Sequence, residues 1–267
     1  MKNPTTPAVI TPESPSLSLI AGLRPVLEAI EAGRVIDRVL LRQGMEGEGF
    51  RRLQTALAAK GIPMQFVPSE KLNRLTPLAH QGVVAYVPPI EYADIEAVLA
   101  AVVARGEQPL VLLLDGVTDV RNFGGIARSA SCAGVHLIIL PAKGAAPVNA
   151  EAIKTSAGAL QHIPVARSAN IRTAVYLLKA LGIQIVAATE KAAQPLYAAD
   201  FTRPTAIIAG AEDTGISAAA LKLADASIRI PLRGPVAALN VSAATAIVLF
   251  EAVRQRELKV ESWLTPN

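Results

Sequence analysis

The chain has 267 residues, enough for one large or two small domains, and a hydrophobic content of 51% excludes a wholly disordered protein. The net charge of +4 favours a polyanionic partner, while an aromatic content of 4% excludes an extensive base-stacking surface. The single cysteine, Cys132, excludes an internal disulfide and fits a reducing, cytoplasmic location, and no apolar run approaches the roughly 20 residues of a membrane span.

The first sixteen residues contain four prolines and no apolar block, so we expect a disordered tail and not a signal peptide. Residues 17–88 are predicted to form a small α/β domain, and the first 90 residues carry a net charge of +3. Its expected elements are a helix over 25–33, a strand over 36–43, a helix over 49–62, and strands over 63–69 and 81–88.

A proline pair, Pro88 and Pro89, is followed by a stretch of net charge −3 in which we expect an acidic amphipathic helix. This change of composition predicts a linker over 89–107 between two basic domains. The second domain is expected over 108–260, with a net charge of +5, and a short tail over 261–267.

Short, continuous apolar runs recur through the second domain, and helical segments separate most of them. Runs without alternation are typical of strands buried on both faces, so they predict a parallel sheet covered by helices. Such sheets bind ligands in the loops at the carboxyl ends of their strands. The expected strands are 109–117, 135–140, 162–166, 183–189, 205–210 and 227–232.

The loop after the first of these strands carries Asn122 and the pair Gly124 and Gly125, followed by a short helix with Arg128 near its start. Glycine lets a backbone approach a ligand closely, and a helix N-terminus is a natural anion site. The alternative is a tight turn with an asparagine cap and a surface arginine. The stretch lacks both the glycine spacing of the dinucleotide fingerprint and the lysine of a phosphate-binding loop.

Two later loops carry polar side chains after buried strands. Glu212 follows the strand at 205–210, where a carboxylate can act on a ligand, although Asp213 or Thr214 can instead make this a helix-capping loop. Asn240 and Ser242 follow a Gly-Pro loop and can serve a site or cap the next helix.

The three histidines, His80, His136 and His162, are scattered along the chain without the spacing of metal ligands. No metal site is therefore expected.

Taken together, the stretches N-F-G-G-I-x-R, G-A-E-D-x-G and I-P-L-R-G-x-x-x-x-L-N-V-S-A-A resemble the three motifs of the SpoU/TrmH family, RNA ribose 2′-O-methyltransferases of the SPOUT superfamily. The stretches GLRPVLEAIEAGRVIDRVLL and HQGVVA are similar to the ribosomal-protein L30e-like RNA-binding domain of many members, and 154–165 to the family's connecting segment. The resemblance covers 17–258 and is nearest to bacterial enzymes that methylate a guanosine ribose in large-subunit ribosomal RNA.

The resemblance implies a deep trefoil knot in the carboxyl-terminal part of the parallel sheet, which forms the pocket for S-adenosylmethionine. Slim loops suit such threading, which is rare among folds, and this explains the glycine, proline and small residues over 233–247. A homodimer is also implied, with the helix over 241–255 at its interface. By motif position, the expected cofactor-binding residues are Gly210, Ala211, Ile230, Leu232, Leu239, Asn240 and Ser242.

Methyl transfer to a ribose requires the 2′-hydroxyl, a poor nucleophile, to lose its proton as it attacks. The catalytic residues that the resemblance implies are Asn122, Arg128, Glu212, Asn240 and Ser242. The family's proposed base is the arginine, but a guanidinium pKa above about 12 favours phosphate binding and stabilisation of the developing alkoxide. Asn122 is expected to position Arg128 or the ribose, and Glu212 to orient Asn122 or Arg128.

Two positions depart from the family's pattern. Ala238 stands where many members have a serine, and the first motif reads D-V-R-N where D-P-x-N is usual, which places Arg121 beside Asn122. The alternatives to an enzyme acting on ribosomal RNA are a tRNA ribose 2′-O-methyltransferase and a non-catalytic RNA-binding member of the same fold. A Rossmann-type methyltransferase or dehydrogenase is less favoured, because its glycine-rich first loop is missing.

Overall fold

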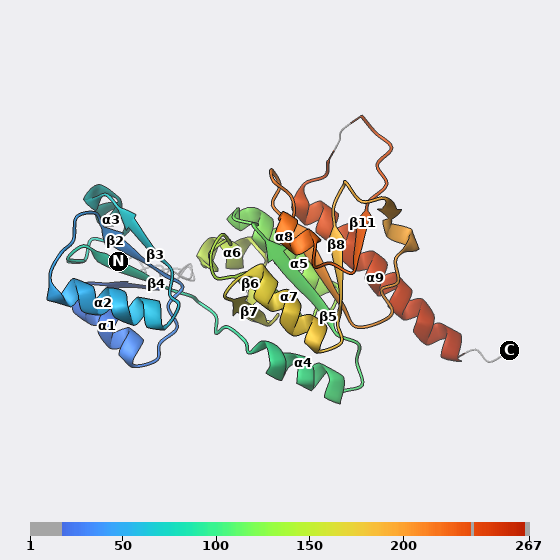
Figure 1. Cartoon of the computed structure of the whole chain (residues 1–267), viewed down its shortest axis with the longest axis horizontal. Helices are drawn as coiled ribbons and strands as arrows, with labels where there is room; N and C mark the ends of the chain where they lie inside the picture. The colour runs from blue at the N-terminus through green and yellow to red at the C-terminus, as the bar shows by residue number, and fades with distance from the viewer. Residues whose placement is uncertain (1–17, 236–237, 265–267) are drawn as a thin grey trace, which may run out of the picture.

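The computed structural model describes residues 18–235 and 238–264, which form two α/β units joined by a short connection (Figure 1). The tail expected over 1–16 lies outside the described residues. The tail expected over 261–267 is helical as far as Leu264, and the rest of it also lies outside.

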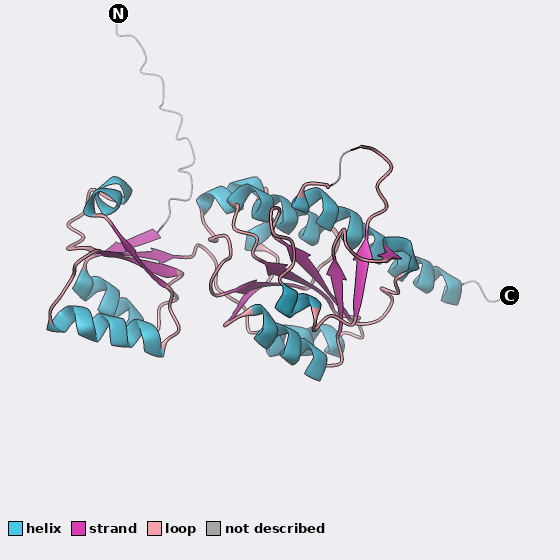
Figure 2. Ribbon diagram, turned by 45° about the horizontal axis from the view of Figure 1, so that its top comes forward, coloured by secondary structure: helices cyan, strands magenta, loops and turns pink. Residues whose placement is uncertain are grey.

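The amino-terminal unit is a small mixed sheet with helices on both faces (Figure 2). The strand order is β1-β4-β2-β3; β2 and β3 are parallel, and β4 is antiparallel to both of its neighbours. Helices α1 and α2 pack on one face and α3 on the other. The elements are β1 (Ser18–Ala21), α1 (Leu23–Glu31), β2 (Arg38–Arg42), α2 (Glu48–Ala59), β3 (Met64–Val67), α3 (Ser69–Leu75) and β4 (Val83–Val87).

Strand β1 and helix α3 are the two elements of this unit that the sequence pattern did not predict. Strand β1 has four residues and pairs with β4 near the end of the domain, with Ser18 opposite Val87, so a long-range contact defines it. Helix α3 buries only Leu72, which leaves no apolar period to detect.

The carboxyl-terminal unit is built on a seven-stranded sheet in which every pair of neighbouring strands is parallel, as predicted. The strand order is β7-β6-β5-β10-β8-β11-β9, so β10 lies between β5 and β8. The strands are β5 (Leu110–Asp115), β6 (Leu137–Pro141), β7 (Val165–Ser168), β8 (Gln184–Ala188), β9 (Gln194–Pro195), β10 (Thr205–Gly210) and β11 (Ala226–Arg229).

Helices cover both faces of this sheet and complete three layers (Figure 2). On one face pack α5 (Val120–Cys132), α6 (Ala150–Thr155) and α9 (Val241–Leu264), and on the other α4 (Ile95–Ala104), α7 (Ile171–Ala180) and α8 (Ala218–Leu221). Strands β5 and β10 are buried along almost their whole length, which explains their continuous apolar sequences.

Helix α4 corrects one expectation about the connection between the units. It contains a single charged residue, Glu96, and is apolar instead of acidic and amphipathic. Leu99 packs on the same side of the large sheet as α7. The other acidic residues flank the helix: Asp94 caps it by accepting a hydrogen bond from the Ala97 N–H at 2.8 Å, and Glu107 pairs with Arg105.

Helix α9 extends beyond the 241–255 expected from the sequence and continues to Leu264. The trefoil knot stays a prediction, because the segment that would pass through it includes 236–237, which lie outside the described residues. Within 18–235 and 238–264, no helix combines the length and apolar character needed to cross a membrane.

Candidate active site

Four side chains from three separate segments, the first turn of α5, the loop after β10 and the start of α9, form one hydrogen-bonded group at the carboxyl edge of the large sheet. We name it the polar cluster: Asn122, Glu212, Asn240 and Ser242. Asn122 Nδ2 donates to Glu212 Oε2 at 3.0 Å, and Asn240 Nδ2 donates to Asn122 Oδ1 at 2.9 Å and to Glu212 Oε1 at 3.3 Å. The Ser242 hydroxyl and N–H both donate to Asn240 Oδ1, at 2.8 and 2.9 Å. Each amide orientation is therefore fixed by its neighbours.

Asn122 lies in the first turn of α5, and this helix starts earlier than the sequence predicts. Asp119 caps the helix by accepting a hydrogen bond from the Asn122 N–H at 2.7 Å, so the helix begins at Val120. Gly124 and Gly125 therefore lie inside α5 and not in a loop before it.

The two glycines of α5 serve helix packing. A Cβ on Gly124 would lie 1.9 Å from Thr155 Oγ1 in α6, and a Cβ on Gly125 would lie 3.3 Å from Ser242 in α9. The missing side chains let α6 and α9 approach α5 closely. This approach brings Ser242 and the start of α9 beside Asn122.

Glu212 is presented by a tight loop after β10. Ala211 and Gly215 exchange two backbone hydrogen bonds of 3.1 and 2.9 Å, which close the loop. A Cβ on Gly210 would lie 2.3 Å from the Gly215 carbonyl carbon, so this close approach requires glycine. The cleft beside the loop, of about 330 Å³, is lined by Gly116, Val117, Thr118, Asp119, Asn122, Ala211, Glu212, Asp213 and Val241.

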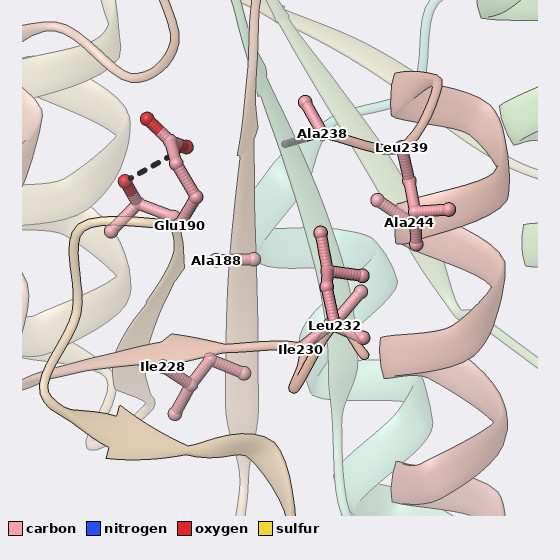
Figure 3. A pocket seen from close by; sticks show the side chains of 9 residues that line it. Ala188, Glu190, Ile228, Ile230, Leu232, Ala238, Leu239 and Ala244 are labelled. Atoms are coloured by element: carbon pink, nitrogen blue, oxygen red, sulfur yellow. Dashed lines mark hydrogen bonds between the residues drawn. The ribbon is translucent and has the colours of Figure 1, made fainter. Parts of the chain in front are cut away.

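A second hollow, which we name the apolar cavity, lies at the ends of β8 and β11 and the start of α9 (Figure 3). Its volume is about 110 Å³, and it adjoins a cavity of about 410 Å³ that shares Glu190, Ile230 and Leu232. The carboxylate of Glu190 supplies negative charge at its margin. The lining residues are Ala188, Thr189, Glu190, Ile228, Ile230, Leu232, Ala238, Leu239 and Ala244.

The residues expected to hold the cofactor are divided between the two hollows. Ile230, Leu232 and Leu239 line the apolar cavity, whereas Ala211 lines the cleft beside Glu212. Asn240 and Ser242 belong to the polar cluster, and Gly210 packs against its own loop.

Sequence reasoning missed the part of the apolar cavity that the end of β8 and the loop after it contribute: Ala188, Thr189 and Glu190. The signal was present, because the strand expected at 183–189 ends at this point and parallel sheets bind ligands at such ends. Ala238, noted for its departure from the family's serine, also lines the apolar cavity.

Arg128 lies apart from the polar cluster. It occupies the second half of α5 and not the helix start, because α5 already begins at Val120. The side chain is exposed, and among the described residues it makes no hydrogen bond or ion pair. Arg121, the other arginine of the motif, pairs with Glu151 at 3.3 Å on the surface.

Metal-binding residues are not gathered anywhere in the part of the chain that the structure describes: no three His, Cys, Asp or Glu side chains form a group that could hold an ion. His136 pairs with Glu107 at 2.8 Å, and His80 Nε2 donates a hydrogen bond to Asn73 Oδ1 at 2.8 Å.

Two families match the two units. Residues 109–250 match the SpoU rRNA Methylase family, and residues 19–93 match the family described as RNA 2′-O ribose methyltransferase substrate binding. The chain is 36% identical over 241 residues to 23S rRNA (guanosine-2′-O-)-methyltransferase RlmB of Escherichia coli, covering 89% of this chain and 98% of that one. It is 35% identical over 240 residues to an uncharacterized tRNA/rRNA methyltransferase of Mycobacterium sp. (strain KMS), covering 89% and 76%.

Two solved structures of methyltransferases are similar to this chain over about 90% of its length. The SpoU methyltransferase AviRb from Streptomyces viridochromogenes, in complex with the cofactor AdoMet, superposes with a TM-score of 0.57, 28% identity and 90% coverage of each chain. The AdoMet-bound rRNA methyltransferase from Sinorhizobium meliloti superposes with a TM-score of 0.55 and 26% identity, over 91% of this chain and 88% of that one.

Fold, site and relatives define an RNA ribose 2′-O-methyltransferase that uses S-adenosylmethionine. The chain belongs to the SpoU rRNA methylase family. The apolar cavity fits this cofactor by its chemistry, because apolar side chains suit an adenine ring and the Glu190 carboxylate suits hydroxyl or ammonium donors.

Proposed function

We propose that the chain methylates the ribose 2′-oxygen of a guanosine in large-subunit ribosomal RNA. The observation that carries this proposal is the similarity to the Escherichia coli relative named as a 23S rRNA guanosine-2′-O-methyltransferase. The matched region spans both units of this chain and nearly the whole relative. A tRNA substrate is the second candidate, because the Mycobacterium relative's name includes both RNAs.

Mapping of ribose methylation in a strain that lacks the gene tests the substrate. We expect one guanosine of large-subunit ribosomal RNA to lose its 2′-O-methyl group, and the gene supplied in trans to restore it. Loss of a methyl group from a tRNA alone would favour the second candidate, and no change in either RNA would contradict both.

Ile230, Leu232 and Leu239 would hold the adenine of S-adenosylmethionine in the apolar cavity, and Glu190 would accept hydrogen bonds from its polar groups. When bound, S-adenosylmethionine supplies an electrophilic methyl group on a sulfonium sulfur. All three apolar residues belong to the carboxyl-terminal unit, so residues from about 105 onward are expected to bind cofactor alone. Calorimetry that finds binding by the full chain only would show that the amino-terminal unit completes the site.

The target ribose lies in the cleft beside the polar cluster. Asn122 and Asn240 hold its hydroxyl groups, and Glu212 is the carboxylate placed to accept the 2′-hydroxyl proton as the oxygen attacks. Ser242 fixes the orientation of Asn240. Arg128, exposed and without a partner among the described residues, binds the phosphate next to the target ribose.

The amino-terminal unit supplies RNA affinity. The support is the match of 19–93 to a substrate-binding family and the net charge of +3 over the first 90 residues. Deletion of 1–88 should weaken RNA binding and flatten its salt dependence, because fewer phosphates are then neutralised. An unchanged salt slope would argue against this assignment.

A homodimer forms through α9. The exposed side chains Ile247, Phe250 and Leu258 follow one another at helical spacing, and they are 38%, 49% and 51% exposed. Light scattering should report a dimer for the parent chain and a monomer for Phe250→Asp. A monomeric parent chain would contradict this assignment.

A further inference from the structure

One carboxylate of the amino-terminal unit lies buried at the junction with the catalytic unit. The Asp37 side chain is only 4% exposed, at the residue before β2, and its N–H is bound to the Tyr86 carbonyl at 2.8 Å. The Tyr92 hydroxyl donates to Asp37 Oδ1 at 2.8 Å, and the Arg167 guanidinium forms an ion pair with the same carboxylate. The three residues come from the amino-terminal unit, the connection and β7 of the catalytic sheet.

Further contacts hold these three side chains in one arrangement. Arg167 Nη1 donates to the Asp37 carbonyl at 3.3 Å, and its guanidinium carbon lies 4.9 Å from the centre of the Tyr92 ring. The Ala93 N–H donates to the Val165 carbonyl at 2.8 Å, which attaches the connection to the same strand as Arg167. Burial and the nearby Asp37 carboxylate raise the pKa of Tyr92 well above its usual range, so the phenol keeps the proton that it donates.

The energetics of this group favour a role in orientation over a role in stability. A buried ion pair contributes little net stability, because desolvation of both charges offsets their attraction. Arg167 Nε is buried without a hydrogen-bond partner, which adds to the cost. What such a pair does well is to disfavour every arrangement that leaves one of its charges buried alone.

The location of the group connects it to the reaction. Arg167 lies toward the carboxyl end of β7, and in an all-parallel sheet this end shares an edge with the carboxyl ends of β5 and β10. Those two strands lead into the start of α5, which carries Asn122, and into the loop that carries Glu212. The amino-terminal unit is thus attached at the edge of the sheet that carries the active site.

We propose that Asp37, Tyr92 and Arg167 form a clamp between the two units that sets the direction in which the amino-terminal unit presents RNA to the polar cluster. Asp37 is a positioning residue: it contacts neither cofactor nor the reacting atoms and acts through the placement of the RNA. This role rests on the proposed function of the amino-terminal unit in RNA binding.

The test compares Asp37→Asn and Tyr92→Phe in the full chain with Glu107→Gln as the matched control. Glu107 pairs with Arg105 and with His136 within the catalytic unit, and the hydrogen bonds from these two side chains lower the pKa of Glu107 to about 2. The substitution Glu107→Gln therefore removes a charged partner without changing the contacts of Asp37, Tyr92 and Arg167 between the two units. Asparagine and phenylalanine keep the shapes of the original side chains, so both variants are expected to fold.

Two readouts separate positioning from a general structural defect. Spin labels on the exposed native Cys132 and on Lys60→Cys report the distance between the units, and methyl transfer to a ribosomal RNA fragment reports function. We expect a broader distance distribution and a roughly tenfold to hundredfold lower kcat/KM for RNA in Asp37→Asn, with unchanged cofactor affinity. Tyr92→Phe is expected to change the distance distribution and kcat/KM in the same direction but by a smaller amount. Glu107→Gln is expected to change neither of them.

Exchange of the charges in Asp37→Arg with Arg167→Asp is expected to recover part of the lost kcat/KM relative to Asp37→Arg alone. Unchanged distance distributions and unchanged kcat/KM in both Asp37→Asn and Tyr92→Phe would overturn the clamp. An unaltered chain that methylates neither ribosomal RNA nor tRNA would instead contradict the proposed function, so the two failures are distinguishable.

Discussion

The polar cluster and the apolar cavity lie at the same edge of one sheet, but different forces build them. Four hydrogen-bonding side chains from three separate segments of the chain fix the polar cluster, and each depends on the orientation of the next. The apolar cavity is a concave surface of aliphatic side chains with one carboxylate at its margin. Directional bonds tolerate little change, whereas apolar contacts lose energy in proportion to the area removed.

Glu212→Gln is the most damaging change that this comparison predicts. Glutamine keeps the shape, but its NH2 group replaces one of the two oxygens that accept hydrogen bonds from Asn122 and Asn240, and it cannot take a proton. We expect the single-turnover rate of methyl transfer to fall by roughly a hundredfold to a thousandfold, as for other preorganised groups. Cofactor affinity, measured by calorimetry, should stay within about twofold of the parent value; a normal rate would remove Glu212 from catalysis.

Arg128→Ala tests whether a residue outside the polar cluster is also required for transfer. We expect transfer to be abolished with nearly unchanged cofactor affinity, because the side chain is free to bind phosphate and lies outside the lining of the apolar cavity. Arg128→Lys keeps a point charge but loses the planar fork, so recovery by lysine identifies an electrostatic anchor. Lysine as inactive as alanine would show that fork geometry or proton acceptance is essential, and near-normal transfer in Arg128→Ala would contradict the assignment.

Ile230→Ala tests the apolar cavity. Removal of most of a partly buried side chain should weaken cofactor binding by about tenfold, the equivalent of about 1.4 kcal/mol of lost apolar contact. At saturating cofactor the transfer rate should match the parent chain, because the polar cluster is untouched. A lower transfer rate at saturating cofactor, with unchanged cofactor affinity, would show that Ile230 acts in the chemical step and not in cofactor binding.

Ala238→Ser gives the smallest effect. The new hydroxyl lies in the lining of the apolar cavity, and the polar cluster is already hydrogen-bonded without it. We expect the transfer rate to stay within about twofold of the parent value, as for most exposed substitutions. A large gain in rate from this substitution would mean that the alanine limits catalysis in the parent chain.

The meeting of the three motifs could be predicted from the sequence, because the carboxyl ends of parallel strands share one edge and Asn122, Glu212 and Asn240 all follow such strands. The start of α5 could not, because the pair Gly124 and Gly125 has the composition of a loop. Only the contact of Gly124 with Thr155 reveals why a helix contains it.

The clamp was also beyond reach from sequence. Asp37 and Arg167 are 130 positions apart, and a single aspartate near the start of a predicted strand has the pattern of an ordinary surface residue. The residues at and just after the end of β8 that line the apolar cavity are a different case. Their position at the end of a strand was predicted from the sequence, and only their role in the cavity was missed.

The insertion of β10 between β5 and β8 constrains how the chain folds on the ribosome. Leu110 pairs with Thr205, so one side of β5 has no partner until 95 further residues have been made. At synthesis rates of about 5–20 residues per second, this apolar strand waits for roughly 5–20 s with an open edge. The amino-terminal unit is complete by then, so the nascent catalytic unit is the part of the chain most exposed to aggregation and to chaperones.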